Sequence, residues 1–296
     1  MDKRKIRDLF GAINVWKRGD QRAPHKPLLI LLALARIARG ESREIPYIQI
    51  DEPLRNLLMD FGPPRKSYHS EYPFWRLQAD GLWEVTGAEG LVARKGNTDP
   101  KKSELLKHDV RGGFTKEIYE TFKNNPELIR EIAASILESH FSESLHQDIL
   151  MAVGLDLHTV QRTAEARDPR FRDQILTTYG HRCAICGFDL WLDDITLGLE
   201  AAHIKWHQAG GPDTPDNGLA LCALHHKTFD LGAFTLSLDR AVLVSGRVSG
   251  TQGFDEWLLR YHGRPVRPPV NPEYVANSTY IAWHNREVFK GPQRSR

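Results

Sequence analysis

The chain has 296 residues, with 40 Lys and Arg against 38 Asp and Glu, and 41% of its residues are hydrophobic. This length and composition exclude a disordered or fibrous protein and predict two ordinary domains with buried cores. The longest apolar run, residues 28–35, is too short to span a bilayer and does not form a signal peptide, so we expect a cytoplasmic protein without a membrane partner.

The small net charge of +2 conceals two basic clusters. Residues 1–40 hold ten Lys or Arg against three acids, and residues 260–296 hold seven against two. Such clusters suit the phosphate backbone of a nucleic acid, although a solvated basic face has the same composition.

The first 62 residues predict mainly helices. An amphipathic helix runs into a basic loop, and an almost continuously apolar helix then begins near Pro27 and ends at Gly40. We expect this apolar helix at the centre of the first domain. His25 and Lys26 stand at its amino end, where unpaired N–H groups favour an anion such as phosphate. A short strand and another helix follow over residues 45–62.

Residues 63–85 interleave aromatic and basic side chains before a strand that ends at Val85. A nucleic-acid surface needs aromatic rings beside Arg and Lys, but aromatic clusters more often form cores. Two assignments stay open within this segment: core for Phe74, Trp75 and Trp83, and contact surface for Tyr72, Pro73 and Arg76.

A helix that starts at Pro126 closes the first domain, and residues 142–165 predict a linker followed by a helix, so we place the domains at residues 1–155 and 156–296. In the second domain an arginine-rich helix precedes the first cysteine pair, and a hairpin with an Asp-Arg turn follows residue 230. A basic, proline-rich tail begins at Arg260, and we expect it either to pack over the domain or to extend along DNA.

All three cysteines lie in one stretch, residues 183–230. Cys183 and Cys186 form a C-x-x-C pair, Cys222 and His225 form a C-x-x-H pair, and two such pairs complete a tetrahedral zinc site. Three reduced, buried cysteines are the alternative, but both spacings are ligand spacings and no cysteine is left over. The sequence therefore predicts structural Zn²⁺, and its free thiols favour a reducing cytoplasm.

His226 and Asp230 follow the second pair, four residues apart. On a helix these side chains lie one turn apart on one face, where they can share a hard divalent cation such as Mg²⁺ or Mn²⁺. His203, on a strand facing that helix, would then activate water near neutral pH, although a single histidine is as often structural.

The order His203, Asn217, His226 beside two zinc knuckles resembles the HNH endonuclease motif, which has a ββα-metal fold. The resemblance covers about a sixth of the chain. It implies that His203 is the general base, that Asn217 pins the loop between the strands, and that His226 is a ligand of the catalytic metal. Asp230 falls where some members place a further ligand. Many members carry Asp or His directly before the base; this chain has alanine there, and Glu200 is the candidate to replace that ligand.

A second resemblance covers about residues 1–155. The stretches APHKPLLILLALARI, HSEYPFWRLQADGLWEV and RGGFTKEIYETFKNNPELI are similar to the sulfur-binding domain of modification-dependent restriction endonucleases, which recognise DNA with a phosphorothioate in its backbone. By this resemblance Tyr72 and Pro73 line an apolar sulfur pocket with Ser70 nearby. His25 and Lys26 hold the phosphate, and Arg76 stands where some members have a small residue.

We therefore expect an α+β protein: a mainly helical, DNA-reading N-terminal domain followed by a zinc-knuckle ββα-metal HNH nuclease domain. The expected function is type IV restriction of phosphorothioate-modified, double-stranded DNA, with phosphodiester hydrolysis by a His-activated water and one divalent metal. The alternatives are an HNH nuclease that reads another modification or a sequence, and a non-catalytic, zinc-stabilised DNA-binding protein. Retention of His203, Asn217, His226 and Asp230 together argues against the last. The sequence leaves open whether a homodimer cuts both strands.

Overall fold

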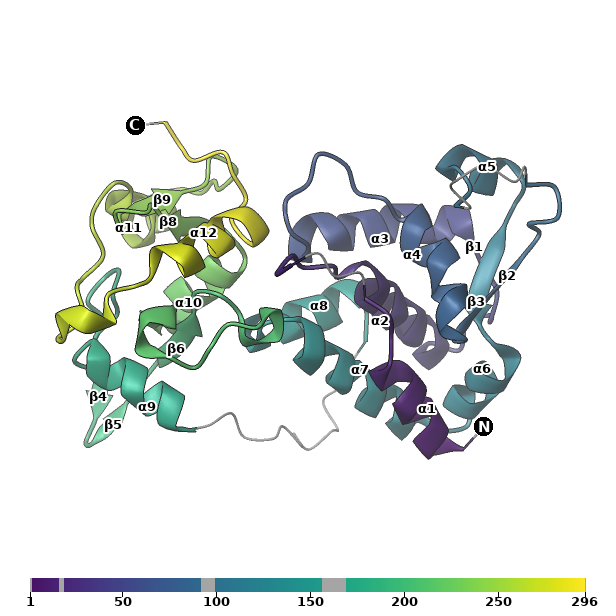
Figure 1. Cartoon of the computed structure of the whole chain (residues 1–296), viewed down its shortest axis with the longest axis horizontal. Helices are drawn as coiled ribbons and strands as arrows, with labels where there is room; N and C mark the ends of the chain where they lie inside the picture. The colour runs from purple at the N-terminus through teal and green to yellow at the C-terminus, as the bar shows by residue number, and fades with distance from the viewer. Residues whose placement is uncertain (1, 16–18, 92–98, 156–168, 296) are drawn as a thin grey trace. The chain divides into compact units, whose positions relative to one another are not determined.

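The computed structural model describes residues 2–15, 19–91, 99–155 and 169–295, and the chain divides into two compact units, residues 1–161 and 162–296 (Figure 1). Each unit has its own buried core and contains both helices and strands. The expected α+β class is therefore confirmed. The predicted domain boundary after residue 155 adjoins residues 156–168, which lie outside the described ranges, and it stays a prediction.

Helix α2 (His25–Ala38) is the centre of the first unit, as its apolar sequence predicts. Residues 28–35 are buried, and the helix packs against α3 (Tyr47–Phe61), α4 (Glu71–Arg76), α6 (Lys116–Lys123), α7 (Pro126–His140) and α8 (His146–Val153). It begins two residues before Pro27, because a proline in the first turn sacrifices no helical hydrogen bond.

A three-stranded antiparallel sheet of order β1–β3–β2 lies beside these helices. Its strands are β1 (Ile45–Pro46), β2 (Trp83–Thr86) and β3 (Arg111–Phe114). Phe74 and Trp83 are buried with their rings 6.0 Å apart, so their assignment to the core is confirmed, whereas Trp75 is only partly buried. The unit also contains α1 (Lys3–Gly11), η1 (Leu77–Asp80), α5 (Lys102–Lys107) and η2 (Glu143–Leu145).

The second unit is built on a ββα module. Strand β6 (Leu199–His203) pairs antiparallel with β7 (Gly218–Cys222), and α10 (Ala223–Asp230) follows directly. Helix α9 (Pro169–Thr178), the predicted arginine-rich helix, packs against both strands. This arrangement places the end of β6 and one face of α10 together, as the HNH resemblance requires.

The remaining elements of the second unit surround this module. They are β4 (Trp191–Leu192), β5 (Ile195–Thr196), η3 (His207–Ala209), η4 (Pro215–Asn217), the predicted hairpin β8 (Phe234–Leu236) and β9 (Val242–Val244), α11 (Gln252–Trp257), η5 (Leu259–Tyr261), η6 (Pro272–Tyr274) and α12 (Ser278–Glu287). The sequence pattern does not predict α12. Among the residues that the structure describes, no helix has the length and apolar character needed to cross a membrane.

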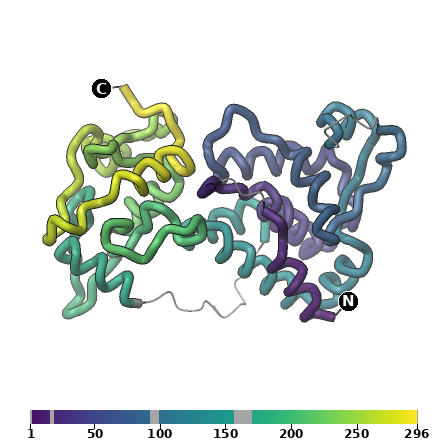
Figure 2. The backbone as a smooth tube through the Cα atoms, viewed as in Figure 1, coloured from purple at the N-terminus to yellow at the C-terminus, as the bar shows by residue number. Residues whose placement is uncertain are grey.

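The basic tail packs over the second unit, which is the first of its two expected positions (Figure 2). The backbone N–H of Arg267 donates to the carbonyl of Ala184 at 2.8 Å, and that of Val270 donates to the carbonyl of Thr178 at 2.8 Å. These hydrogen bonds attach the tail to the end of α9 and to the segment that carries the first cysteine pair.

Candidate functional site

The four predicted zinc ligands converge in the second unit. Ligand atoms of Cys183, Cys186, Cys222 and His225 all lie within 4.8 Å of one another. Cys183 Sγ is 3.7 Å from His225 Nδ1, and Cys186 Sγ is 3.9 Å from Cys222 Sγ. A tetrahedron with Zn–S bonds of about 2.3 Å separates its ligand atoms by about 3.7 Å, so this cluster fits a zinc ion in both size and donor set.

The backbone orients His225 for such an ion. Its Nε2–H donates to the carbonyl of Trp257 at 2.8 Å, which leaves Nδ1 directed at the three sulfurs. Hydrogen bonds from Cys186 and Cys222 lower the pKa of Cys183 and favour a thiolate. Burial alone would lower the pKa of His225, but its contact with Cys183 raises it to about 9. The thiolate of Cys183 thus lies where a cation would bind.

His203 lies at the end of β6, almost fully buried, with its ring stacked on Phe171 at 4.0 Å between centroids. Its Nε2 is 2.7 Å from Asp213 Oδ1. Because a carboxylate accepts, this bond places the ring proton on Nε2 and makes Nδ1 the basic nitrogen. The motif alone does not predict the role of Asp213, although the polar Gly-Gly-Pro-Asp loop between the two motif halves is a signal for it in the sequence.

Asn217 holds the loop that carries Asp213, which is the role that the HNH resemblance implies for it. Its side chain is fully buried and bonds both the N–H and the carbonyl of Lys205, at 2.9 and 3.0 Å, and the carbonyl of Pro212 at 2.9 Å. A Cβ at Gly211 would lie 1.8 Å from the carbonyl oxygen of Lys205, so the tight loop requires glycine there.

The predicted residues of the catalytic metal meet around His226. Its Nδ1 is 2.6 Å from Glu200 Oε2, and its Nε2 is 3.1 Å from Asp230 Oδ2. Asp230 is buried and its second oxygen accepts from the indole N–H of Trp206 at 3.0 Å, whereas the side chain of Glu200 is 46% exposed. Burial alone would lower the pKa of His226, but the two carboxylates raise it to about 9. The carboxylates of Glu200 and Asp230 thus stabilise a positive charge at this site.

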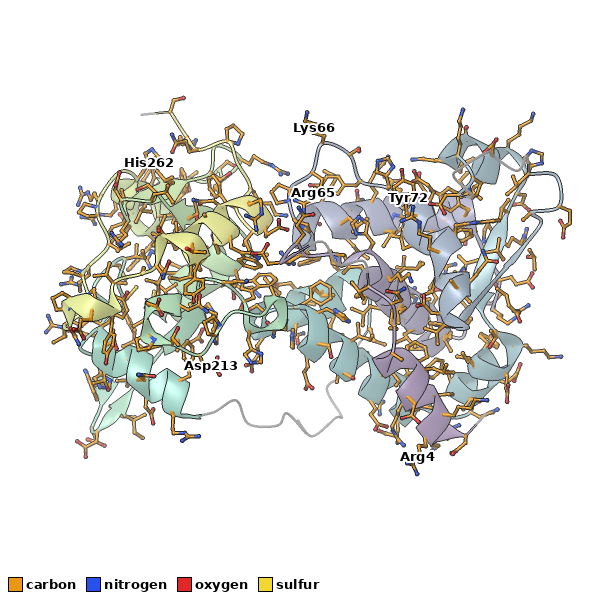
Figure 3. The ribbon with its side chains drawn as sticks, viewed as in Figure 1. Arg4, Arg65, Lys66, Tyr72, Asp213 and His262 are labelled. Carbon is orange, nitrogen blue, oxygen red and sulfur yellow. The ribbon has the colours of Figure 1, made fainter. Side chains whose placement is uncertain are left out.

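Tyr72, which the resemblance places in the sulfur pocket, lies on α4 (Figure 3). The ring of His69 stacks on Tyr72 at 4.5 Å, and the guanidinium of Arg76 lies 4.8 Å from the same ring. Pro73 is buried beside them. Ser70 is fully buried; it bonds Tyr47 at 2.8 Å and Asp51 at 2.6 Å, so it fixes the start of α4 from behind.

His25 and Lys26 lie at the amino end of α2, as predicted. Burial and the nearby charges of Arg65, His69 and Arg76 lower the pKa of His25 to about 4, so it is neutral at pH 7. Lys26 Nζ donates to Asp80 Oδ2 at 2.5 Å and to the carbonyl of Asn14 at 2.8 Å. The DNA contacts of these side chains stay predictions.

The solved sulfur-binding domain of ScoMcrA complexed with phosphorothioated DNA is 24% identical, with a TM-score of 0.44, and the match covers 50% of this chain and 94% of that one. The corresponding domain of SprMcrA is 19% identical, with coverage of 52% and 95% and a TM-score of 0.43. The type IV phosphorothioation-dependent restriction endonuclease ScoMcrA is 22% identical; the match covers 52% of this chain, only 34% of that one, and has a TM-score of 0.43. A search of curated proteins found no match.

Two protein families match the sequence, one in each unit. The family described as HNH endonuclease matches residues 183–237, which contain both cysteine pairs and the ββα module. The family described as ScoMcrA-like, DNA sulfur-binding domain matches residues 3–158, more than half of the chain. The protein is thus a DNA-binding HNH endonuclease, and it belongs to the ScoMcrA-like DNA sulfur-binding domain family.

Proposed function

We propose that this protein recognises phosphorothioate-modified DNA through its first unit and hydrolyses phosphodiester bonds through its second. One observation carries the proposal. A single chain joins a unit of the sulfur-binding family to an HNH module in which the pair His203–Asp213 and the cluster around His226 are both assembled.

Recognition would rest on the partly exposed ring of Tyr72, which the buried Pro73 adjoins. Sulfur is larger, softer and less strongly hydrated than oxygen, so an apolar pocket loses less free energy when it takes up sulfur than when it desolvates a phosphate oxygen. The solved ScoMcrA and SprMcrA domains are described in complex with phosphorothioated DNA, which supports the same ligand here. His25 would meet the backbone as a neutral hydrogen-bond donor, because its pKa is about 4.

Hydrolysis would begin when His203 Nδ1 removes a proton from the attacking water. Asp213, hydrogen-bonded to Nε2, fixes the orientation of the ring and stabilises the imidazolium that forms. The burial of His203 against Phe171 holds the ring in one position. Asn217 acts indirectly, since it fixes the loop that presents Asp213.

Glu200 and His226 Nδ1 would hold one Mg²⁺ or Mn²⁺, and Asp230 would orient His226 through Nε2. A divalent ion there supplies stabilisation of the negative charge that develops on the phosphate. Zn²⁺ in the cysteine cluster would be structural, because three cysteines and one histidine fill a tetrahedral site.

Replacing the proposed base tests the proposal. His203→Ala should lower the cleavage rate of phosphorothioate-containing DNA by about 10²–10⁴ while leaving the affinity for that DNA unchanged, because only proton removal is lost. His207→Ala is the matched control, because the ring centroid of this exposed histidine lies 6.2 Å from that of His203. This variant should cleave DNA at the wild-type rate. Near wild-type cleavage by His203→Ala would rule out His203 as the base.

A further inference from the structure

Arg76 places a cation against the ring that we propose to receive sulfur. Its guanidinium carbon lies 4.8 Å from the centroid of Tyr72, and His69 stacks on the same ring at 4.5 Å with an interplanar angle of 13°. A positive group at this position would attract any DNA phosphate, with or without sulfur. The sequence alone does not explain why a domain that recognises sulfur has an arginine at this position.

The charge of Arg76 is balanced by a buried acid. Arg76 Nε donates to Asp99 Oδ2 at 2.7 Å, and Nη2 donates to the same oxygen. The side chain of Asp99 is only 7% exposed, whereas that of Arg76 is 49% exposed, so DNA can reach the cation but not the acid. Because Asp99 is buried and Arg76 is half exposed, water screens the pair on one side only, and Asp99 offsets part of the positive charge that the guanidinium presents at Tyr72.

This balance affects oxygen and sulfur differently. Hydrogen bonds from a guanidinium to a charged oxygen are short and strong, and sulfur is the weaker acceptor. An unbalanced Arg76 would thus favour an ordinary phosphate oxygen at the Tyr72 ring. Unmodified phosphates greatly outnumber phosphorothioates in a genome, so weak binding to them matters as much as strong binding to sulfur.

We propose that Asp99 is a specificity-determining residue, which weakens binding to ordinary phosphodiester DNA by offsetting the positive charge of Arg76 beside Tyr72. The sulfur-specific part of this inference rests on the proposed function, whereas the weakening of ordinary binding does not depend on it.

The pair of Lys26 with Asp80 provides a matched comparison within the same unit. Asp80 is also the more buried partner, with side-chain exposures of 14% for Lys26 and 5% for Asp80. Lys26 Nζ bonds Asp80 and the carbonyl of Asn14, so its charge is balanced by Asp80, whereas Arg76, which lies against the Tyr72 ring, is paired with Asp99. Removing the charge of Asp80 should strengthen binding to any duplex by the same factor, with or without sulfur.

The test measures the affinity of the full chain in the His203→Ala background for a duplex with one phosphorothioate and for its all-oxygen twin, in several base contexts. Asp99→Asn should tighten binding to the all-oxygen duplex about tenfold and steepen the salt dependence by about one phosphate contact. The gain on the sulfur duplex should be smaller, so the ratio of the two affinities falls. Glu131→Gln, which removes one acid from the exposed Arg7–Glu131 pair, should change neither affinity.

A double variant keeps the test decisive if Asp99→Asn alters the fold. Arg76→Gln together with Asp99→Asn should lose the gain on the all-oxygen duplex, because the gain requires the cation. Unchanged or weaker binding of Asp99→Asn to that duplex, with thermal unfolding like that of the parent, would overturn the inference, as would equal gains on both duplexes. If the parent shows no preference for sulfur, the proposed function fails, but the gain on the all-oxygen duplex still decides the role of Asp99.

Discussion

At the scale of single residues, the two carboxylates around His226 differ in what they can do. Asp230 is buried and both of its oxygens are engaged, by Trp206 and by His226 Nε2. Glu200 is half exposed and faces Nδ1. Because both oxygens of Asp230 already have partners and Glu200 is open to solvent, these contacts favour Glu200 as the ligand and Asp230 as the residue that orients His226.

Asp230→Asn separates these two roles. Loss of an orienting carboxylate should weaken divalent-ion affinity roughly 10–100-fold, and saturating Mn²⁺ should restore most of the cleavage rate. Glu200→Gln, which removes the proposed ligand itself, should not be restored in this way. Cleavage rates measured over a range of Mn²⁺ concentrations would show it, and an Asp230→Asn variant that no concentration restores would identify Asp230 as a direct ligand.

The sequence predicts the residues of the motif but not all of their partners. Spacing alone brings Cys183 to Cys186 and Cys222 to His225, because each pair lies on one turn, and two such pairs predict one zinc site. The bond between His203 and Asp213 depends on how a ten-residue loop folds back, and its path is set by Asn217 and Gly211. The partners of Arg76 and Lys26 come from distant segments, so pattern reading could not find them.

At the scale of elements, the zinc knuckles join the segment that carries the first cysteine pair to the ββα module. Cys183 precedes the exposed hairpin β4–β5, whereas Cys222 ends β7 and His225 lies on α10. The strands β4 and β5 have two residues each, and isolated hairpins of this size are marginal in water. The ion would therefore fix the first cysteine pair, and the hairpin that follows it, to the ββα module.

Cys222→Ser should unfold the second unit and leave the first unit folded. Structural zinc couples binding to folding, so losing one ligand removes much of the folding free energy of the unit. Hydrogen exchange would show lost protection in β6, β7 and α10 but not in α2. Elemental analysis of the wild-type protein should find one zinc per chain, and a protein without tightly bound zinc would contradict the assignment.

His25 links the stability of the first unit to pH. Its pKa is about 4 in the fold, chiefly because of burial, against 6.5 in the unfolded chain. The unfolded chain therefore binds a proton that the fold excludes, and stability present above pH 6.5 is lost as the pH falls towards 4. This shift corresponds to about 2–3 kcal/mol between pH 7 and pH 4.5.

Hydrogen exchange of the α2 amides at the two pH values measures this loss. His25→Gln should retain more of its protection at pH 4.5 than the wild type, because glutamine does not titrate. If both proteins lose protection equally, other groups carry the pH dependence.

At the scale of the whole molecule, the sequence predicts the fold class and both functional units, but not every element. The apolar centre of α2 and the HNH spacing are strong local signals. The sequence does not predict helix α12, because its buried residues include the polar His284 and Glu287 and therefore show no clear hydrophobic face. His284 packs against the ring of Phe229 only in the folded unit. Polar residues that become buried through tertiary contacts leave no hydrophobic pattern in the sequence.

The central claim is that a sulfur-reading unit directs an HNH nuclease in one chain. Cleavage of matched plasmids with and without phosphorothioate linkages, in the presence of Mg²⁺ or Mn²⁺, tests it most directly. The wild-type protein should cut the sulfur-containing plasmid and leave its all-oxygen twin intact. Tyr72→Ala should lose this preference, because the apolar wall is removed while the nuclease unit is untouched. Equal cleavage of both plasmids by the wild-type protein would contradict the account.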